Sequence, residues 1–210
     1  MSPNYKISYF NVDGSGEPSR YILAYGASQW EDYRVPRNEW PDLKKKTPFG
    51  KLPVLEVDGK QIAQSNTIAR YLGKQFNLVG KDDWEAVQCD MLVDTYGDLS
   101  QSLMSFMFES DPTKKEEKKK KALEEDGPFY LGKFEDILTK NGSGYLVGSQ
   151  LTWADLFFAA KLSSMKERHP ELLKPFPKLL ALVDKVNNLP KIKAYLDKRP
   201  ARDPPPQRKN

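Results

Sequence analysis

Cysteine and histidine are nearly missing from this chain of 210 residues, which contains one of each. The single cysteine, Cys89, excludes an intrachain disulfide, which agrees with a reducing compartment. The same scarcity leaves too few ligands for a metal site built from Cys and His, so we expect no metal. No cysteine stands at the start of the first predicted helix, which argues against a disulfide-exchange mechanism.

Long apolar runs and a strong charge of one sign are also absent. No apolar stretch approaches the roughly 18 residues of a membrane span, and the polar start at residues 1–6 lacks the apolar core of a signal peptide. The net charge is +4, from 33 basic and 29 acidic residues, and hydrophobic residues make up 39% of the chain. These values are typical of a soluble globular protein. We therefore expect a cytoplasmic protein that binds neither membrane nor nucleic acid.

The first part of the chain alternates strand and helix patterns. Residues 6–10 have the pattern of a first strand, and residues 32–35 that of a second. Between them, Pro18 stands near the start of a helix and Gly26 just past its end. A right-handed crossover through this helix makes the two strands parallel.

A hairpin pattern follows this β-α-β unit. Asp58-Gly59 separates two apolar-rich strands, 53–57 and 60–63, and this dipeptide is a strong two-residue hairpin signal. Ser65 then stands where it can cap a further helix. The pattern therefore predicts a small mixed sheet with helices packed on it.

The remainder of the chain predicts helices only. A long helical pattern spans residues 83–109 and includes Cys89, which we expect to pack inside the helical part rather than to act as a nucleophile. Thr152 and Asp155 form a variant capping box at the start of another helix, so Asp155 is expected to have a structural role. The tail from Asp203 onward is expected to fray.

Lysines dominate residues 114–121, where they could attract nucleic acid or acidic lipids. The same run contains two Glu–Lys pairs spaced four residues apart, a spacing that stabilises helices. A solvated helix explains the run without any ligand, and it is the reading that we favour.

Eight short segments, spread over nearly the whole chain, match a known family in order and spacing. The segments are 4–11, Glu39-Trp40-Pro41, 47–55, Gln64-Ser65, 68–72, 93–95, 151–155 and 198–200. With them the sequence resembles the cytosolic glutathione transferases, and among these the sigma class with its prostaglandin D synthase-like branch. The resemblance implies an α/β domain followed by an all-α domain. Residues 1–80 would form a thioredoxin-like domain that binds glutathione on a mixed four-stranded sheet, and residues 81–210 an all-helical domain that contributes the electrophile pocket and dimer contacts.

The resemblance also implies the chemistry and the partners. Glutathione would be a co-substrate rather than a bound cofactor, a hydrophobic electrophile would be the second substrate, and the protein would be a homodimer. The leading function is conjugation of glutathione to electrophiles, together with reduction of organic hydroperoxides. A glutathione-dependent isomerase of the prostaglandin type and a catalytically silent, crystallin-like structural relative are the alternatives. The intact segment 50–53 favours an enzyme over the crystallin-like relative.

Tyr9 ends the first predicted strand, at the position of the family's catalytic tyrosine. A free thiol has a pKa of about 8.5, so only about 3% is thiolate at pH 7. A phenol stays protonated at that pH and can donate a hydrogen bond that stabilises the thiolate. From the pattern alone, an aromatic side chain that fills the sheet core is an equal alternative, and the resemblance favours the catalytic role.

The resemblance assigns the cysteinyl and γ-glutamyl contacts to two short motifs. Leu52-Pro53 matches a cis peptide bond whose preceding residue pairs with the cysteinyl backbone, although a proline can also simply open a strand. Gln64 and Ser65 match the site of the γ-glutamyl carboxylate, because the N-terminus of a helix favours an anion. A plain capping role for Ser65 is compatible with that site.

The other glutathione contacts follow from single residues. Trp40, Lys44 and Lys51 match positions that hold the glycyl end, although most lysines are merely solvated. Asp98 matches an acid that reaches the amine of the glutathione bound to the partner subunit. An exposed helix carboxylate is the alternative for Asp98.

Several positions depart from the sigma pattern. Asp13 stands where many members carry Arg. Ser15 and Ser105 replace an Arg and a Trp of the vertebrate prostaglandin D synthases, and Gly97 replaces an Asp that helps bind a divalent metal there. These changes argue against a dedicated prostaglandin synthase and against metal activation. The electrophile pocket is therefore expected to differ, with the following residues lining it: Phe10, Val12, Ser15 and Met104.

Overall fold

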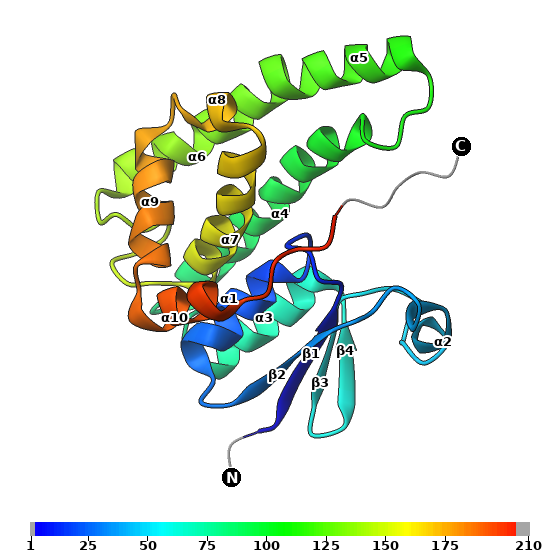
Figure 1. Ribbon diagram of the computed structural model, residues 1–210. Helices are drawn as coiled ribbons and strands as arrows, with labels where there is room; N and C mark the ends of the chain where they lie inside the picture. The colour runs from blue at the N-terminus through cyan, green and yellow to red at the C-terminus, as the bar shows by residue number, and fades with distance from the viewer. Residues whose placement is uncertain (1–2, 205–210) are drawn as a thin grey trace.

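The computed structural model describes residues 3–204, and Figure 1 shows a small sheet with helices on it below a larger group of helices. Within that range the strands are β1 (Tyr5–Tyr9), β2 (Trp30–Arg34), β3 (Val54–Val57) and β4 (Lys60–Ala63). They form one sheet in the order β2-β1-β3-β4. β1 runs parallel to β2 and antiparallel to β3, and β3 pairs with β4 as a hairpin. The predicted mixed four-stranded sheet is confirmed.

Two helices cover the sheet and bury its apolar side. α1 (Glu17–Gly26) and α3 (Ser65–Gln75) pack against each other, whereas the short α2 (Trp40–Lys44) stands apart on the connection between β2 and β3 (Figure 1). Ile7 of β1 lies opposite Leu55 of β3 in the register, and both are fully buried. Burial of aliphatic side chains of this size stabilises the fold by about 1.5–3 kcal/mol each.

After α3, the described residues form helices and connecting loops and contain no strand, as predicted. The helices are α4 (Asp83–Ser105), α5 (Pro112–Lys120), the π-helix η1 (Lys121–Asp126), α6 (Gly127–Asn141), α7 (Trp153–Arg168), α8 (Pro170–Leu173), α9 (Pro177–Asn187) and α10 (Pro190–Lys198). α4 ends earlier than the predicted residue 109, because the chain leaves the helix through turns at Met107 and Glu109. Cys89 is fully buried in α4, and burial raises the pKa of its thiol to about 11, which agrees with a packing role.

α7 is the central helix of the molecule. Its first eight residues are all buried, and it contacts α1, α3, α4 and α9. The predicted structural role of Asp155 is confirmed: its carboxylate accepts hydrogen bonds from the backbone N–H of Thr152 at 2.7 Å and of Leu146 at 2.7 Å. α7 therefore joins the helical part to the helices on the sheet.

The lysine-rich run forms the solvated helix that was expected, since every residue of α5 is exposed. Its ion pairs differ from the expected Glu116–Lys120 and Glu117–Lys121 pairs. Lys119 lies 3.6 Å from Glu116, three residues away. Lys121 at the start of η1 bonds Asp126 at 2.6 Å instead. Within the described range, no helix is long and apolar enough to cross a membrane.

Candidate active site

Tyr9 is the last residue of β1, and its partly buried hydroxyl faces the loop that leads into α1. The Tyr9 oxygen accepts a hydrogen bond from the backbone N–H of Ser15 at 3.0 Å. Among residues 3–204, no acceptor takes the phenolic proton itself. The geometry therefore leaves that proton free to be donated to a ligand.

Two glycines in this loop lie against the Tyr9 ring. A Cβ atom at Gly14, where φ is +39°, would lie 2.4 Å from the Tyr9 oxygen, and one at Gly16 would lie 2.5 Å from Cγ of the ring. Real Cβ atoms do not approach so closely, so both positions need glycine. Neither glycine was expected at the site, although two closely spaced glycines between a predicted strand and a predicted helix were a usable signal.

Arg20 of α1 fixes the same loop through hydrogen bonds to its backbone. The fully buried guanidinium donates to the carbonyl oxygens of Phe10 at 3.0 Å and Val12 at 2.9 Å, and to the carboxylate of Asp32 at 2.8 Å. It also lies 5.6 Å from the centroid of the Tyr9 ring. Hydrogen bonds to a charged group are about twice as strong as neutral ones, so Arg20 fixes the backbone on which Tyr9 depends. Sequence reasoning missed this residue.

The strand register brings three expected site residues to one end of the sheet. Ser8 lies opposite Val54, and Val54 lies opposite Ala63. Tyr9, Pro53 and Gln64 are the residues that adjoin these pairs in sequence at the same end of the sheet. The peptide bond between Leu52 and Pro53 is cis, as expected.

The start of α3 differs from the sequence prediction. Ser65 was expected to cap the helix, but Gln64 occupies the cap position and Ser65 is the first helical residue, with no capping hydrogen bond from a side chain. The reason is the backbone of Gln64, which has φ +74° and ψ 114° and turns the chain sharply from β4 into α3. Such backbone strain at a residue other than glycine tends to occur at functional sites. The hydroxyl of Ser65 is thereby left for another partner.

The residues expected to hold the glycyl end lie on and after α2. Trp40, the first residue of α2, packs edge-on against Phe10 with 5.5 Å between ring centroids. Phe10 in turn lies 6.0 Å from the Tyr9 ring. Lys44 passes over Gly50, where an added Cβ would lie 3.4 Å from the Lys44 Cε atom, and both Lys44 and Lys51 are exposed.

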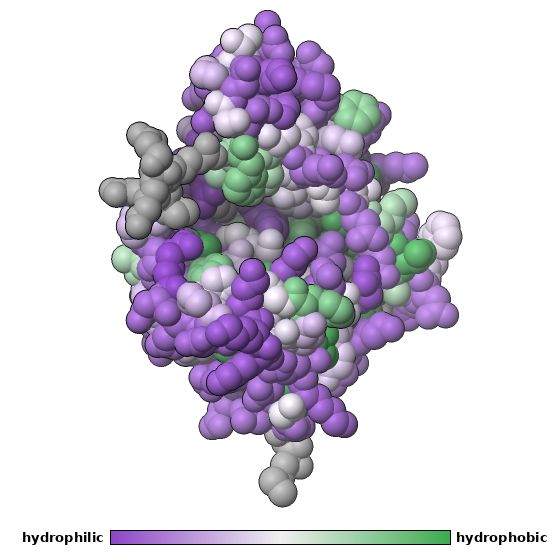
Figure 2. Space-filling model, turned by 90° about the vertical axis from the view of Figure 1, so that its right-hand side faces the viewer, coloured by the Kyte–Doolittle hydropathy of each residue, from purple (hydrophilic) through white to green (hydrophobic). Residues whose placement is uncertain are grey.

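A cavity of about 130 Å³ opens beside the Tyr9 loop, between α4 and α7. Figure 2 shows this side of the molecule hollowed between the helical part and the part that contains the sheet. The lining is Asp13, Gly14, Tyr96, Ser100, Leu103, Met104, Met107, Ala160, Lys161, Ser164, Met165, Arg168 and His169. Of the residues expected to line the electrophile pocket, Met104 does so, whereas Phe10, Val12 and Ser15 are not among the lining residues.

Lys161 is one of several polar residues that line this cavity, and sequence reasoning did not anticipate it. Its ammonium nitrogen donates to the carbonyl oxygen of Gly14 at 2.9 Å. Burial lowers the pKa of Lys161 to about 8. The residue stands in the middle of an apolar helix, so its sequence context gives no sign that it reaches the loop after β1.

The C-terminal segment closes one side of the site. Arg202 pairs with the buried carboxylate of Asp13 at 2.8 Å, and Arg199 lies 3.6 Å from the same carboxylate. The backbone N–H of Asp203 donates to the carbonyl oxygen of Asn11 at 2.8 Å. The expected fraying is therefore wrong for Asp203, because this pairing holds the segment, and residues 205–210 lie outside the described range.

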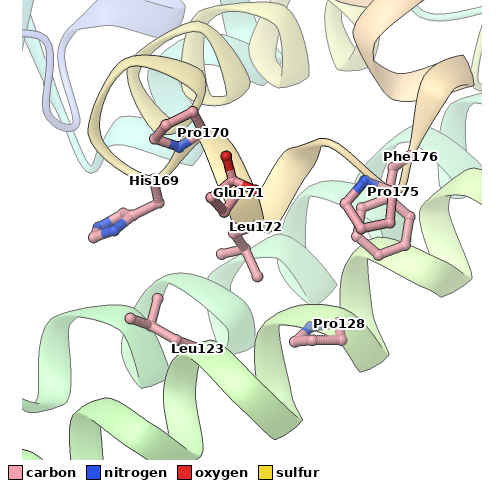
Figure 3. A pocket seen from close by; sticks show the side chains of 8 residues that line it. All are labelled: Leu123, Pro128, His169, Pro170, Glu171, Leu172, Pro175 and Phe176. Carbon is pink, nitrogen blue, oxygen red and sulfur yellow. The ribbon is translucent and has the colours of Figure 1, made fainter.

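A second cavity, of about 440 Å³, lies between α8 and the region of η1 and α6. Figure 3 shows its lining, which is mostly apolar: Leu123, Pro128, His169, Pro170, Glu171, Leu172, Pro175 and Phe176. None of the expected site residues takes part in it. It is larger than the cavity beside Tyr9, and no tyrosine is among these lining residues.

Asp98 lies on the exposed side of α4, away from the lining of the Tyr9 cavity. Counting along the helix, it shares one face with Trp84, Val87, Met91 and Asp94, all of which are exposed. Trp84 is 71% and Met91 56% exposed, which is high for side chains of this kind. Three of the five residues on this face, Trp84, Val87 and Met91, are exposed apolar side chains one helical turn apart, and the other two are aspartates.

Comparison with known proteins identifies the family. Residues 8–74 match the glutathione S-transferase N-terminal domain, and residues 97–199 match the glutathione S-transferase C-terminal domain. A glutathione S-transferase of Anopheles gambiae is 43% identical over 94% of this chain and 98% of its own length. Glutathione S-transferase S1 of Drosophila melanogaster is 44% identical over 94% of this chain and 79% of its own length. The solved structure of prostaglandin synthase D of Nilaparvata lugens superposes with a TM-score of 0.89 at 44% identity, covering 95% of this chain and 100% of that one.

Proposed function

Since the chain belongs to the glutathione S-transferase family and is similar to its sigma class, we propose that Tyr9 activates the thiol of bound glutathione for conjugation to hydrophobic electrophiles. The observation that carries the proposal is the hydrogen bond from the Ser15 N–H to the Tyr9 oxygen. Because this bond uses the oxygen as an acceptor, the phenolic proton is left to be donated to sulfur. The cavity beside the same loop offers space for the second substrate.

In the proposed reaction, the glutathione thiol loses its proton to solvent water, and the Tyr9 hydroxyl donates a hydrogen bond to the resulting thiolate. The bond stabilises the charged form and so lowers the pKa of the thiol. The sulfur electron pair then forms a bond to an electrophilic carbon, and the leaving group departs with the electron pair of the bond that breaks. Tyr9 itself stays protonated throughout. In the hydroperoxide reduction, the same thiolate would attack the terminal peroxide oxygen and break the O–O bond. The alkoxide would leave and take a proton to become the alcohol, and a second glutathione would convert the resulting sulfenic acid into glutathione disulfide and water.

The glutathione backbone fits the end of the sheet in this proposal. The backbone of Leu52 pairs with the cysteinyl part, and the γ-glutamyl carboxylate lies at the N-terminus of α3, where Gln64 and Ser65 are. The first amides of a helix have no partner within the helix, and the helix dipole favours an anion there. Trp40, Lys44 and Lys51 hold the glycyl carboxylate.

The proposed electrophile is an apolar molecule. Three methionines line the cavity, Met104, Met107 and Met165, together with Leu103 and Tyr96. Methionine side chains adapt to ligands of different shape. This lining supports a transferase with a broad range of apolar substrates.

We also propose a homodimer that forms through the exposed face of α4. Trp84, Val87 and Met91 would be covered by the partner, and Asp98 on the same face would then reach the glutathione amine of the partner's site. A twofold dimer is the commonest soluble oligomer. The buried, unpaired Cys89 agrees with a cytoplasmic location.

A prostaglandin-type isomerase remains the second candidate, because the Nilaparvata lugens relative bears that name. Replacement of the cation expected at position 13 by Asp13, which pairs with Arg202, gives this chain a different pocket entrance. A panel of electrophiles, hydroperoxides and a prostaglandin endoperoxide, each tested with glutathione, separates the candidates.

Tyr9→Phe provides the direct test of the proposed chemistry. Removal of one preorganised donor should lower the conjugation turnover number by roughly 10²-fold, while glutathione still binds. Tyr145→Phe is the matched control, because Tyr145 lies on the surface loop between α6 and α7 and packs against Lys185. Equal turnover in the two variants would refute the assignment of Tyr9.

A further inference from the structure

One peptide group lies directly between Lys161 and Tyr9. The ammonium nitrogen of Lys161 donates to the carbonyl oxygen of Gly14 at 2.9 Å. The N–H of that same peptide group belongs to Ser15, and it donates to the Tyr9 oxygen at 3.0 Å. The two hydrogen bonds therefore form a chain from a cation on α7 to the phenol at the end of β1.

Such a chain is cooperative. A charged donor on a carbonyl oxygen withdraws electron density from the peptide, so the N–H at its other end becomes a better donor. A stronger N–H···O bond on the Tyr9 oxygen makes the phenolic proton a better donor in turn. The position of the peptide matters as well, because Gly14 has φ +39° and no side chain of its own to hold it.

We infer that Lys161 is a positioning residue for thiol activation: its ammonium holds and polarises the Gly14–Ser15 peptide, which in turn orients the Tyr9 hydroxyl toward the glutathione sulfur. The inference rests on the proposed function of Tyr9 and extends it to a residue of the helical part, 147 residues away from Gly14 along the chain. Lys161 touches neither glutathione nor the reacting atoms in this role.

The surroundings of Lys161 set the pH range over which it acts. The charged and titratable groups that face it are Asp13 on the loop, Glu17 on α1, Tyr96 on α4, and Arg168 and His169 at the end of α7. Burial lowers the pKa of Lys161 to about 8, with Arg168 acting in the same direction and Asp13 and Glu17 opposing it. The ammonium is thus present below about pH 8 and lost above it, so its contribution to turnover should decline on the alkaline side.

Three variants test the role at saturating glutathione with dinitrochlorobenzene as the electrophile. Lys161→Met keeps the aliphatic stem without the charge and should lower turnover at pH 7 by about tenfold, because a misplaced donor loses much of its effect. Lys161→Arg keeps its positive charge both below and above about pH 8. It should therefore have the turnover of the parent at pH 7 and should lack the decline on the alkaline side. Lys166→Met is the matched control, since Lys166 lies on the same helix and pairs with exposed Asp184.

A double-mutant cycle decides whether Lys161 acts through Tyr9. In a Tyr9→Phe background, Lys161→Met should have no further effect on turnover, because the group that it orients is gone. The inference is overturned if folded Lys161→Met keeps the turnover and pH profile of the parent, if Lys161→Arg keeps the alkaline decline, or if the loss is the same in both backgrounds. A failure of the proposed function is distinct, because Tyr9→Phe alone would then leave turnover unchanged.

Discussion

At Tyr9, a loop backbone rather than another side chain sets the position of the phenolic oxygen. Gly14 and Gly16 allow the loop to approach the Tyr9 ring, and the backbone N–H of Ser15 donates a hydrogen bond to the phenolic oxygen. Arg20 then fixes the carbonyl groups that precede them. Each of these contacts constrains the same hydroxyl, and the proposed stabilisation of the thiolate relies on a donor that is held in place in this way.

Ser65→Ala tests the anion site at the start of α3. Loss of one hydrogen bond to a charged ligand, about 1.5–3 kcal/mol, should weaken glutathione binding about tenfold to a hundredfold. Because Ser65 makes no capping bond, the free energy of unfolding should change by less than about 0.5 kcal/mol. Calorimetric titration measures the affinity, with Ser149→Ala in an exposed turn as control. If affinity stays at the parent value, Ser65 has no part in binding.

Among the secondary-structure elements, the start of α7 depends on a single side chain, that of Asp155, which holds the backbone on both sides of the preceding loop. The Asp155 carboxylate is fully buried and accepts from two backbone N–H groups and the Thr152 hydroxyl. α7 also contacts α1 and α3. A change here should therefore affect the stability of the whole chain more than its chemistry.

Asp155→Ala should reduce the free energy of unfolding by about 3 kcal/mol or more, because two buried N–H groups lose their partner at about 1–3 kcal/mol each. Urea unfolding measures the change. Asp184→Ala removes an exposed ion pair with Lys166 and should stay within about 1 kcal/mol of the parent. A loss below about 1 kcal/mol for Asp155→Ala would contradict the structural role.

The elements that local patterns predict are those whose signals lie within a few residues. Asp58 and Gly59 both have positive φ, as the hairpin signal requires, and the capping box at Asp155 was likewise readable. The start of α3 was not, because the backbone of Gln64 is set by the end of the sheet rather than by its neighbours in sequence. Lys161 was missed for the same reason, since its contact with Gly14 spans 147 residues.

At the scale of the whole molecule, the site is assembled from both parts of the chain. The sheet end supplies Tyr9, and α4 and α7 supply the cavity beside it. The C-terminal segment adds Arg202 to the loop through Asp13. A proposed partner subunit would add Asp98, which is not among the described residues that line the cavity beside Tyr9.

Sedimentation equilibrium should therefore give about twice the 24.0 kDa chain mass. Met91→Lys, on the exposed face of α4, should shift the protein to a monomer and weaken glutathione binding by loss of Asp98. Phe129→Lys is the matched control, because Phe129 is 58% exposed against 56% for Met91 but lies on α6. A parent that is monomeric and fully active would refute the cross-subunit role.

The proposed activation of the glutathione thiol by Tyr9 is tested most directly by the ultraviolet absorbance of the thiolate of bound glutathione. This absorbance is followed against pH in the parent and in Tyr9→Phe. A free thiol ionises with a pKa of about 8.5, and a hydrogen bond to its charged form lowers that value. We expect a midpoint for the parent complex about one to two pH units below 8.5, and a midpoint near 8.5 for Tyr9→Phe. The same midpoint in both complexes, with glutathione bound in each, would contradict the proposed role of Tyr9.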